Sequence, residues 1–298
     1  MIEVQQLTKV YGTTTAIASL DFSIERGEIV GFLGPNGAGK TTTMRILAGS
    51  LGATSGVARV GGVETSSQPR AVKAMVGYLP EFPPLYTDMT VRSYLRFCAQ
   101  LKRAPNPKAD VERVIERVGL TEVAHRLIQH TSKGYRQRVG IAQALVHSPQ
   151  VLILDEPASG LDPAQRVEIR NLVRELATGD VTVILSTHVL PEVEAICDRA
   201  IIIHEGKIIA EDRVEALTQA NRVLRVRVAR PDPLLLARLA ALEGVAEANE
   251  TENGVFVLRT TDDVREHVAS AAVAHGLLEL RAEAGLEDIY LQLTGGTA

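Results

Sequence analysis

The chain has 298 residues, which is long enough for one large domain and a smaller one, each with a hydrophobic core. Its 32 lysine and arginine residues against 36 acidic residues give a net charge of −4, which disfavours a protein that mainly coats DNA or RNA. No apolar run approaches the ~18 residues of a membrane-spanning helix, no signal segment opens the sequence, and two distant cysteines suggest no disulfide framework, so we expect a soluble, cytoplasmic protein.

The beginning of the chain predicts half-buried antiparallel strands, because apolar and polar residues alternate in IEVQQLTKVYG and AIASLDFSIERG. Continuous apolar runs follow, separated by helical patterns, at residues 28–33, 151–155, 182–187 and 200–204. Buried strands separated by helices indicate an α/β core with a largely parallel sheet. Between the first and second of these runs, residues from about 88 to 145 show helical periodicity, which predicts a helical insertion.

The composition changes after Ala220, since residues 222–298 contain 8 arginines, 12 acids and no lysine. The patterns there predict a strand, a helix, two strands, a helix and a strand, at 222–229, 233–242, 244–249, 254–260, 263–275 and 277–282, then a short helix in LEDIYLQL. This order indicates a ferredoxin-like α+β domain of βαββαβ type. We therefore predict a first domain over residues 1–220 and an accessory or dimerisation domain over residues 222–298.

The segment GPNGAGKTT fits the phosphate-loop pattern G-x-x-x-x-G-K-[ST]. An apolar strand precedes it and a helical pattern follows it, as phosphate binding by backbone N–H groups and a helix N-terminus requires. We expect Lys40 to reach the β- and γ-phosphates and the Thr41 hydroxyl to bind Mg²⁺. The candidate ATP-binding loop consists of Gly34, Pro35, Asn36, Gly37, Ala38, Gly39, Lys40, Thr41 and Thr42.

Two acidic residues end the apolar strand of VLILDEP. In phosphate-loop NTPases such a strand places an aspartate at the magnesium ion, so we expect Asp155 to bind Mg²⁺ through water. Glu156 follows directly and is our candidate for polarising the attacking water. The alternative, in which the two acids merely cap a strand, is disfavoured by the phosphate loop.

Together these motifs resemble the nucleotide-binding domain of ATP-binding cassette (ABC) proteins, over residues 1 to about 220. The resemblance implies that Tyr11, in KVYG, stacks on adenine and that Asp162, in SGLD, lies in a loop that communicates across a dimer interface. It also implies that His188, in STH, contacts the γ-phosphate and that Glu81 binds Mg²⁺. The family usually has glutamine where this chain has Glu81; a carboxylate remains an oxygen ligand for Mg²⁺ but has no hydrogen-bond donor.

The stretch TSKGY, residues 131–135, occupies the place of the family signature L-S-G-G-Q at the start of a helix. Ser132 and Gly134, the two residues that would touch phosphate, are present, whereas Thr131, Lys133 and Tyr135 replace the family's residues. A helix N-terminus is worth only about 0.3–1 kcal/mol to an anion at an exposed site. The resemblance therefore implies a head-to-tail homodimer in which this loop completes an ATP site on another chain.

The leading prediction is the ATPase subunit of an ABC exporter. GYLPEFPPLYTDMTVRSYLRF and the terminal GLEDIYLQLTGG resemble ATPases of bacterial multidrug, gliding-motility and copper-site maturation exporters. This resemblance implies a separate integral-membrane permease, contacted by Phe82 to Tyr86, and a position on the inner face of the cell membrane.

The sequence leaves two other classes of function to consider. A soluble ABC protein that acts on ribosomes or DNA is disfavoured, because the chain has one cassette, no long coiled-coil insertion and no basic excess; we expect no nucleic-acid partner. The C-terminal domain could sense a small ligand or stabilise the dimer, and the absence of a phosphate loop or paired catalytic groups there favours the second role.

Overall fold

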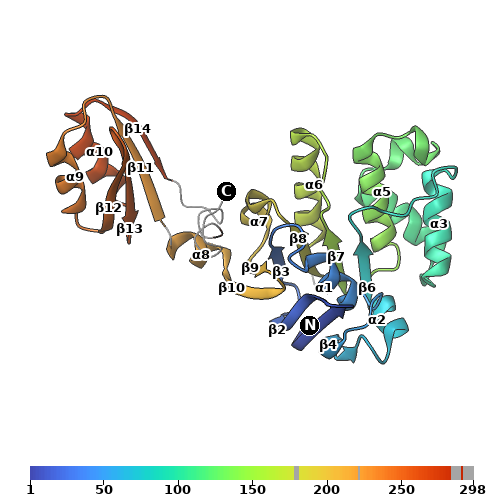
Figure 1. Cartoon of the computed structure of the whole chain (residues 1–298). Helices are drawn as coiled ribbons and strands as arrows, with labels where there is room; N and C mark the ends of the chain where they lie inside the picture. Colours follow the sequence, from blue (N-terminus) through green and yellow to red (C-terminus); the bar gives the residue numbers. More distant parts are fainter. Residues whose placement is uncertain (178–180, 221, 283–289, 291–298) are drawn as a thin grey trace. The chain divides into compact units, whose positions relative to one another are not determined.

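The computed structural model describes residues 1–177, 181–220, 222–282 and Tyr290. They form two compact units, Met1–Glu211 and Asp212–Ala298, each with its own sheets and helices (Figure 1). Within the described residues, no helix has the length and apolar composition needed to cross a membrane. The first unit holds all the residues singled out above as candidate site residues.

The first sheet is antiparallel and has the strand order β2-β1-β4-β5. Burial alternates over residues 2–5 of β1, and after an irregularity in the pairing with β2, Leu7 is buried again; Ile2 pairs with Ile24 of β2. The predicted antiparallel strands are thus confirmed. The strands are β1 (Ile2–Tyr11), β2 (Thr14–Ile24), β4 (Ser55–Val60) and β5 (Val63–Glu64).

The second sheet forms the α/β core, with the order β10-β9-β3-β8-β7-β6 and parallel pairing from β9 through β6. Every residue of β7 and β8 is buried, which explains their continuous apolar sequences. Leu33 pairs with Thr187 and Asp155 with Ser186, so three strands end side by side and present the site loops at one edge. The strands are β3 (Ile29–Leu33), β6 (Val76–Leu79), β7 (Val151–Asp155), β8 (Thr182–Thr187), β9 (Arg199–His204) and β10 (Lys207–Arg213).

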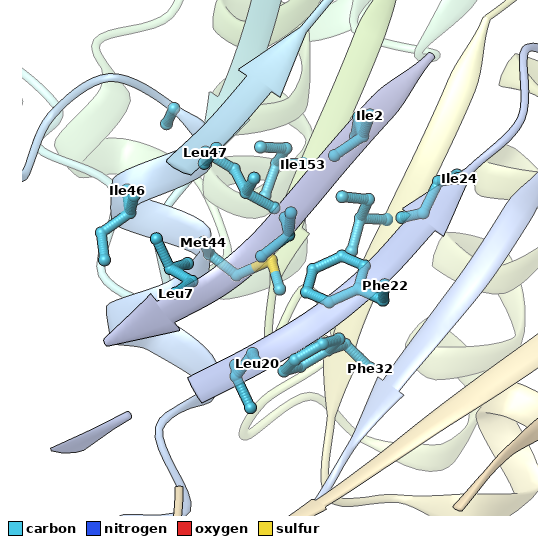
Figure 2. Close-up of a cluster of buried hydrophobic side chains, with 14 of the residues drawn as sticks. Ile2, Leu7, Leu20, Phe22, Ile24, Phe32, Met44, Ile46, Leu47 and Ile153 are labelled. Carbon is cyan, nitrogen blue, oxygen red and sulfur yellow. The ribbon is translucent and has the colours of Figure 1, made fainter. Parts of the chain in front are cut away.

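The main hydrophobic core joins these two sheets to helix α1 (Figure 2). Phe22 of β2 and Phe32 of β3 lie with ring centroids 5.7 Å apart, and Met44 of α1 is fully buried in the same cluster. This packing fixes α1 against the sheet and thereby fixes the loop between β3 and α1. The side chains labelled in Figure 2 are Ile2, Leu7, Leu20, Phe22, Ile24, Phe32, Met44, Ile46, Leu47 and Ile153.

Helices flank the α/β core, and three of them form the predicted helical insertion between β6 and β7 (Figure 1). The Thr90 side chain accepts a hydrogen bond from the Ser93 N–H and so caps the first of these helices. The inserted helices are α3 (Val91–Leu101), α4 (Pro107–Arg117) and α5 (Lys133–Leu145), with short 3₁₀ turns at Thr121–Val123 and Ile128–His130. The others are α1 (Lys40–Leu47), α2 (Pro69–Met75), α6 (Pro163–Leu176) and α7 (Leu190–Ile196).

The second unit begins with α8 (Val214–Ala220) and confirms the predicted βαββαβ order. Its antiparallel sheet has the order β12-β13-β11-β14, and Phe256 and Leu258 of β13 pack in its core. The short helix predicted in LEDIYLQL lies outside the described residues except for Tyr290. The remaining elements are β11 (Arg222–Val228), α9 (Pro233–Ala240), β12 (Val245–Glu252), β13 (Val255–Thr260), α10 (Arg265–Val273) and β14 (Leu277–Ala282).

Candidate nucleotide-binding and catalytic site

The phosphate loop connects the end of β3 to the start of α1, and its glycines fit a tight turn. Gly37 and Gly39 have φ angles of 83° and 104°, which L-residues with side chains rarely adopt. A Cβ at Gly39 would lie 2.5 Å from the carbonyl oxygen of Ala16, and one at Gly34 would lie 2.2 Å from that of Ile203. Close approach to neighbouring backbone therefore requires glycine at both Gly34 and Gly39.

Lys40 is buried at the first position of α1, and its ammonium turns back over the loop. Its Nζ donates hydrogen bonds to the carbonyl oxygens of Gly34 at 2.7 Å and Pro35 at 3.1 Å, and lies 3.7 Å from Oε1 of Glu156. Burial lowers the pKa of Lys40, an effect that the nearby Glu156 and Asp155 carboxylates oppose. A cation is thus held where the loop can receive an anion.

The phosphate loop opens on a cavity of about 300 Å³ that brings together most of the predicted site. Ala16, which the sequence analysis did not identify, also lines it, and no motif marks this residue. Gly34 and Ala38 are buried parts of the same loop. The predicted residues lining the cavity are Pro35, Asn36, Gly37, Gly39, Lys40, Thr41, Thr42, Glu81 and Glu156.

Asp155 is fully buried at the end of β7, beside the base of this cavity. Its Oδ1 accepts a hydrogen bond from the Ser186 hydroxyl at 2.8 Å, whereas its Oδ2 has no hydrogen-bond partner among the described residues. Burial raises the pKa of Asp155, and the Ser186 hydrogen bond opposes this rise. A buried carboxylate oxygen without a partner suits a bound cation or a water that a cation holds.

The donor set also fits Mg²⁺ better than a transition metal. In the described parts of the chain, no group of three or more His, Cys, Asp or Glu side chains forms a metal cage. Mg²⁺ is commonly held by one or two carboxylates with waters and substrate phosphates, and Asp155, Glu81 and the Thr41 hydroxyl offer such oxygens.

Glu156 lies at the centre of a hydrogen-bonded group at the same edge of the sheet. Its Oε1 is 2.9 Å from Nδ1 of His188, and because an ionised carboxylate can only accept, Nδ1 carries the hydrogen. Glu156 has a φ of 50°, held by a hydrogen bond from its N–H to the Ser186 carbonyl at 2.8 Å. Such a conformation costs about 1–3 kcal/mol in a non-glycine residue and is concentrated at functional sites.

Thr187 and Glu192 extend this group, and the sequence analysis did not identify either of them. The Thr187 hydroxyl lies 3.2 Å from Oε2 of Glu192 and 3.5 Å from Oε2 of Glu156. Thr187 is adjacent to the STH histidine and could have been inferred from the end of β8, whereas Glu192 lies in α7 with no motif to mark it. Burial raises the pKa of Glu192, and the Thr187 hydrogen bond opposes this rise.

Tyr11, Asp162 and His188 are among the predicted residues that do not line the phosphate cavity. Tyr11 ends β1 with 46% of its surface exposed, and the Lys9 ammonium lies over its ring at 5.1 Å. Asp162 caps α6, where its side chain accepts a hydrogen bond from the Gln165 N–H at 2.8 Å. His188 reaches the site through Glu156, and half of its side chain is exposed.

The signature loop faces a different cavity. Ser132 caps α5 by accepting a hydrogen bond from the Tyr135 N–H at 3.3 Å, as its residue type predicts. Ser132 and Gly134 line a cavity of about 450 Å³ that no phosphate-loop residue lines. The structure of one chain therefore does not bring the signature loop and the phosphate loop into one cavity.

The loop after β6 carries exposed aromatic side chains. Phe82 is 82% exposed and Tyr86 is 52% exposed, although the Tyr86 ring also contacts Tyr94 and Phe97 of α3. This loop begins at Glu81 in the phosphate cavity, so it connects the site to a surface that displays apolar groups.

The ABC transporter family model matches residues 17–159. The chain is 35% identical to the uncharacterized ABC transporter ATP-binding protein YxlF of Bacillus subtilis (strain 168), over 98% of this chain and 99% of the relative. It is also 35% identical to the Nod factor export ATP-binding protein I of Paraburkholderia xenovorans (strain LB400), over 99% of this chain and 97% of the relative. The dimeric ATP-binding cassette MJ0796, in a post-hydrolysis state with ADP and Pi, shares the fold with a TM-score of 0.66 at 22% identity, over 72% of this chain and 98% of that chain.

Proposed function

Because this chain belongs to the ATP-binding proteins of ABC transporters, we propose that it hydrolyses ATP with Mg²⁺ to drive a separate membrane permease. The observation that carries the proposal is the convergence of Lys40, Asp155, Glu156 and His188 at the edge where β3, β7 and β8 end. A cation in the phosphate loop, a buried carboxylate with one oxygen left without a partner, and a second carboxylate bonded to a histidine suit the transfer of a phosphoryl group to water.

In this proposal, the phosphate loop binds ATP through its N–H groups and Lys40, with Tyr11 stacking on adenine. Thr41, Asp155 and Glu81 would hold Mg²⁺, directly or through water. Bound Mg²⁺ would supply neutralisation of the phosphate charge. Because Lys40 already lies 3.7 Å from Glu156, bound phosphate would compete with that carboxylate for the ammonium.

Glu156 would accept a proton from, or orient, the attacking water. His188 donates from Nδ1 to Glu156, which leaves Nε2 directed elsewhere and available to a γ-phosphate oxygen when it is protonated. The hydrogen bond from His188 would also fix the orientation of the Glu156 carboxylate.

Phosphate release by the purified chain tests this assignment. We expect Glu156→Gln to lower kcat by about 10²- to 10⁴-fold, the contribution of a positioned general base, while ATP still binds. Glu116→Gln, on the exposed face of α4, is the matched control and should leave kcat unchanged. Undiminished turnover by Glu156→Gln would refute the proposed role.

We further propose that the ATPase works as a head-to-tail homodimer. Ser132 and Gly134 line a cavity separate from the phosphate loop, so they can reach a γ-phosphate only on another chain. The Asp162 loop would lie at that interface. Sedimentation of Glu156→Gln with and without ATP tests the dimer: ATP should convert monomer to dimer, and a protein that stays monomeric at high concentration, with or without its permease, would contradict it.

For the partner, we propose an exporter permease on the inner face of the cell membrane. The full-length similarity to a protein named for Nod factor export supports the direction, and the exposed aromatic groups of Phe82 to Tyr86 are the proposed permease contacts. Phe82→Asp should abolish co-purification of the permease and its stimulation of ATPase activity, whereas basal ATPase activity should persist. Retained co-purification would remove Phe82 from the interface.

The C-terminal unit is proposed to stabilise the dimer. Deleting residues 222–298 leaves the whole phosphate site in the chain, so ATP binding should persist while the ATP-induced dimer weakens. An unchanged dimer would exclude this role and favour a ligand-sensing one.

A further inference from the structure

Thr187, at the end of β8, presents one hydroxyl hydrogen to two carboxylates. Its Oγ1 lies 3.2 Å from Oε2 of Glu192 and 3.5 Å from Oε2 of Glu156. The same oxygen accepts a hydrogen bond from the Val189 N–H at 3.1 Å. A hydroxyl has a single hydrogen, so it can donate to only one of the two carboxylates at a time. The shorter distance directs this hydrogen to Glu192, which belongs to α7.

The two oxygens of Glu156 are consequently bound unequally. Oε1 accepts the hydrogen bond of His188 at 2.9 Å and lies 3.7 Å from the Lys40 ammonium. Among the described residues, Oε2 has only its long contact with the Thr187 hydroxyl. Hydrogen bonds to a carboxylate weaken it as a base, because they favour the ionised form. Oε2 is therefore the oxygen that is open to the proton of an attacking water, as long as the hydroxyl hydrogen points to Glu192.

The charge on Glu192 decides the direction of the Thr187 hydroxyl. An ionised Glu192 can only accept, so the hydroxyl donates to it. A protonated Glu192 donates to Oγ1 instead, and Oγ1 then accepts from both Val189 and Glu192 and donates to Oε2 of Glu156. In this second arrangement both oxygens of Glu156 accept hydrogen bonds, so the carboxylate is a weaker base.

Several neighbouring groups act on the protonation of Glu192. Burial raises the pKa of its carboxyl group, and the nearby Glu156 carboxylate adds to this rise. The Thr187 hydrogen bond, Arg166 of α6 and His188 oppose the rise in pKa. Ionisable side chains that also lie beside α7 are those of Cys197 and Arg174.

We propose that Glu192 is a positioning residue for Glu156 and that it acts through the Thr187 hydroxyl. Its ionised carboxylate holds the hydroxyl hydrogen away from Glu156, so that Oε2 of Glu156 accepts the proton of the attacking water. When Glu192 is protonated, the hydroxyl turns to Oε2 and the reaction slows. This inference rests on the proposed function, in which Glu156 is the general base, and it adds a residue of β8 and a residue of α7 to the groups that control the reaction.

A double-mutant cycle on phosphate release tests the coupling, with wild type, Glu192→Gln, Thr187→Val and the double variant as full-length chains. A glutamine amide donates to Oγ1 as a protonated carboxyl group does. Glu192→Gln should therefore lower kcat about three- to thirtyfold, the range that one hydrogen bond to a charged group produces, and leave the ATP affinity unchanged. In the Thr187→Val background, the same substitution should change kcat by less than about twofold, because no hydroxyl remains to be reversed.

Two controls separate this coupling from a general effect of substitution. Thr187→Ser retains the hydroxyl, so Glu192→Gln should lower kcat in that background as it does in the wild type. Glu194→Gln changes an exposed acid of the same helix and should leave kcat unchanged.

The pH dependence of kcat gives a second readout, because glutamine does not ionise. As the pH falls from about 8 to about 5, Glu192 of the wild type takes up a proton, so the ratio of the wild-type kcat to that of Glu192→Gln should shrink. Without nucleotide, Glu192→Gln should unfold in urea at a midpoint at least as high as that of the wild type, because an amide replaces a partly buried charge.

Three results would overturn the inference: equal losses of kcat from Glu192→Gln with and without the Thr187 hydroxyl, a kcat ratio that stays constant with pH, or a lower urea midpoint. Undiminished turnover by Glu156→Gln would instead refute the proposed function.

Discussion

Gly39→Ala provides a strong test of how the phosphate loop is built, because two separate costs meet at this residue. Its φ of 104° is unfavourable for an L-residue, which costs about 1–2 kcal/mol or more. The added Cβ would lie 2.5 Å from the Ala16 carbonyl oxygen, and the shift that this requires costs about 1–3 kcal/mol. We therefore expect the free energy of unfolding of the first unit to fall by about 2–5 kcal/mol.

Gly37→Ala is the matched control, since Gly37 has a φ of 83° but nothing within 4 Å of the added Cβ. It should cost only the backbone term, about 1–2 kcal/mol. Gly12→Ala, in the turn between β1 and β2, has a φ of 58° and equally open space, so it tests the backbone term outside the site.

Urea unfolding of the nucleotide-free proteins, followed by circular dichroism, measures the difference. At an m value of about 3 kcal/mol per molar, an extra 2 kcal/mol places the Gly39→Ala midpoint about 0.7 M below that of Gly37→Ala. Equal midpoints for these two variants would refute the reasoning, because only Gly39 faces the Ala16 carbonyl.

Three further predictions concern buried groups. Burial raises the pKa of Asp155 in the folded chain, so the ionised carboxylate opposes folding. Without nucleotide, Asp155→Asn should therefore have a higher urea unfolding midpoint than the wild type at pH 7.5, by a margin that shrinks as the pH falls towards that pKa, while its Mg²⁺-dependent ATP binding should weaken. A lower midpoint at pH 7.5 would contradict this prediction. Burial lowers the pKa of His147 to about 4, so as the pH falls the histidine takes up its proton in the unfolded chain before it does so in the folded chain. The free energy of unfolding should therefore fall by about 2 kcal/mol between pH 7 and pH 5. Urea midpoints measured over this pH range should not show that loss in His147→Gln. Phe256→Ala, in the core of the second unit, should lower the free energy of unfolding of that unit by about 3–5 kcal/mol and leave the ATP affinity of the first unit unchanged. A loss of ATP binding in this variant would show that the two units do not fold independently.

The fold, and most of the residues that line the candidate phosphate cavity, could be predicted from the sequence. Loop residues 34–42 are contiguous in the sequence. The close approach of neighbouring backbone restricts both Gly34 and Gly39 to glycine, and Gly39 also has a positive φ. Asp155 and Glu156 were identifiable because a buried strand can end only at the edge of its sheet, where the loop also lies. The βαββαβ order of the second unit followed from alternating burial and turn residues.

The tertiary structure alone decided which distant side chains meet. The hydrogen bonds of His188 with Glu156 and of Ser186 with Asp155 depend on the order of β7 and β8 in the sheet, which local periodicity does not encode. The shared cavity of Glu81 and Lys133 likewise arises because α5 packs beside the loop after β6. Local sequence patterns fix the conformation of each segment. Contacts between segments depend on how all the segments together bury the hydrophobic core, and this packing exists only in the folded chain.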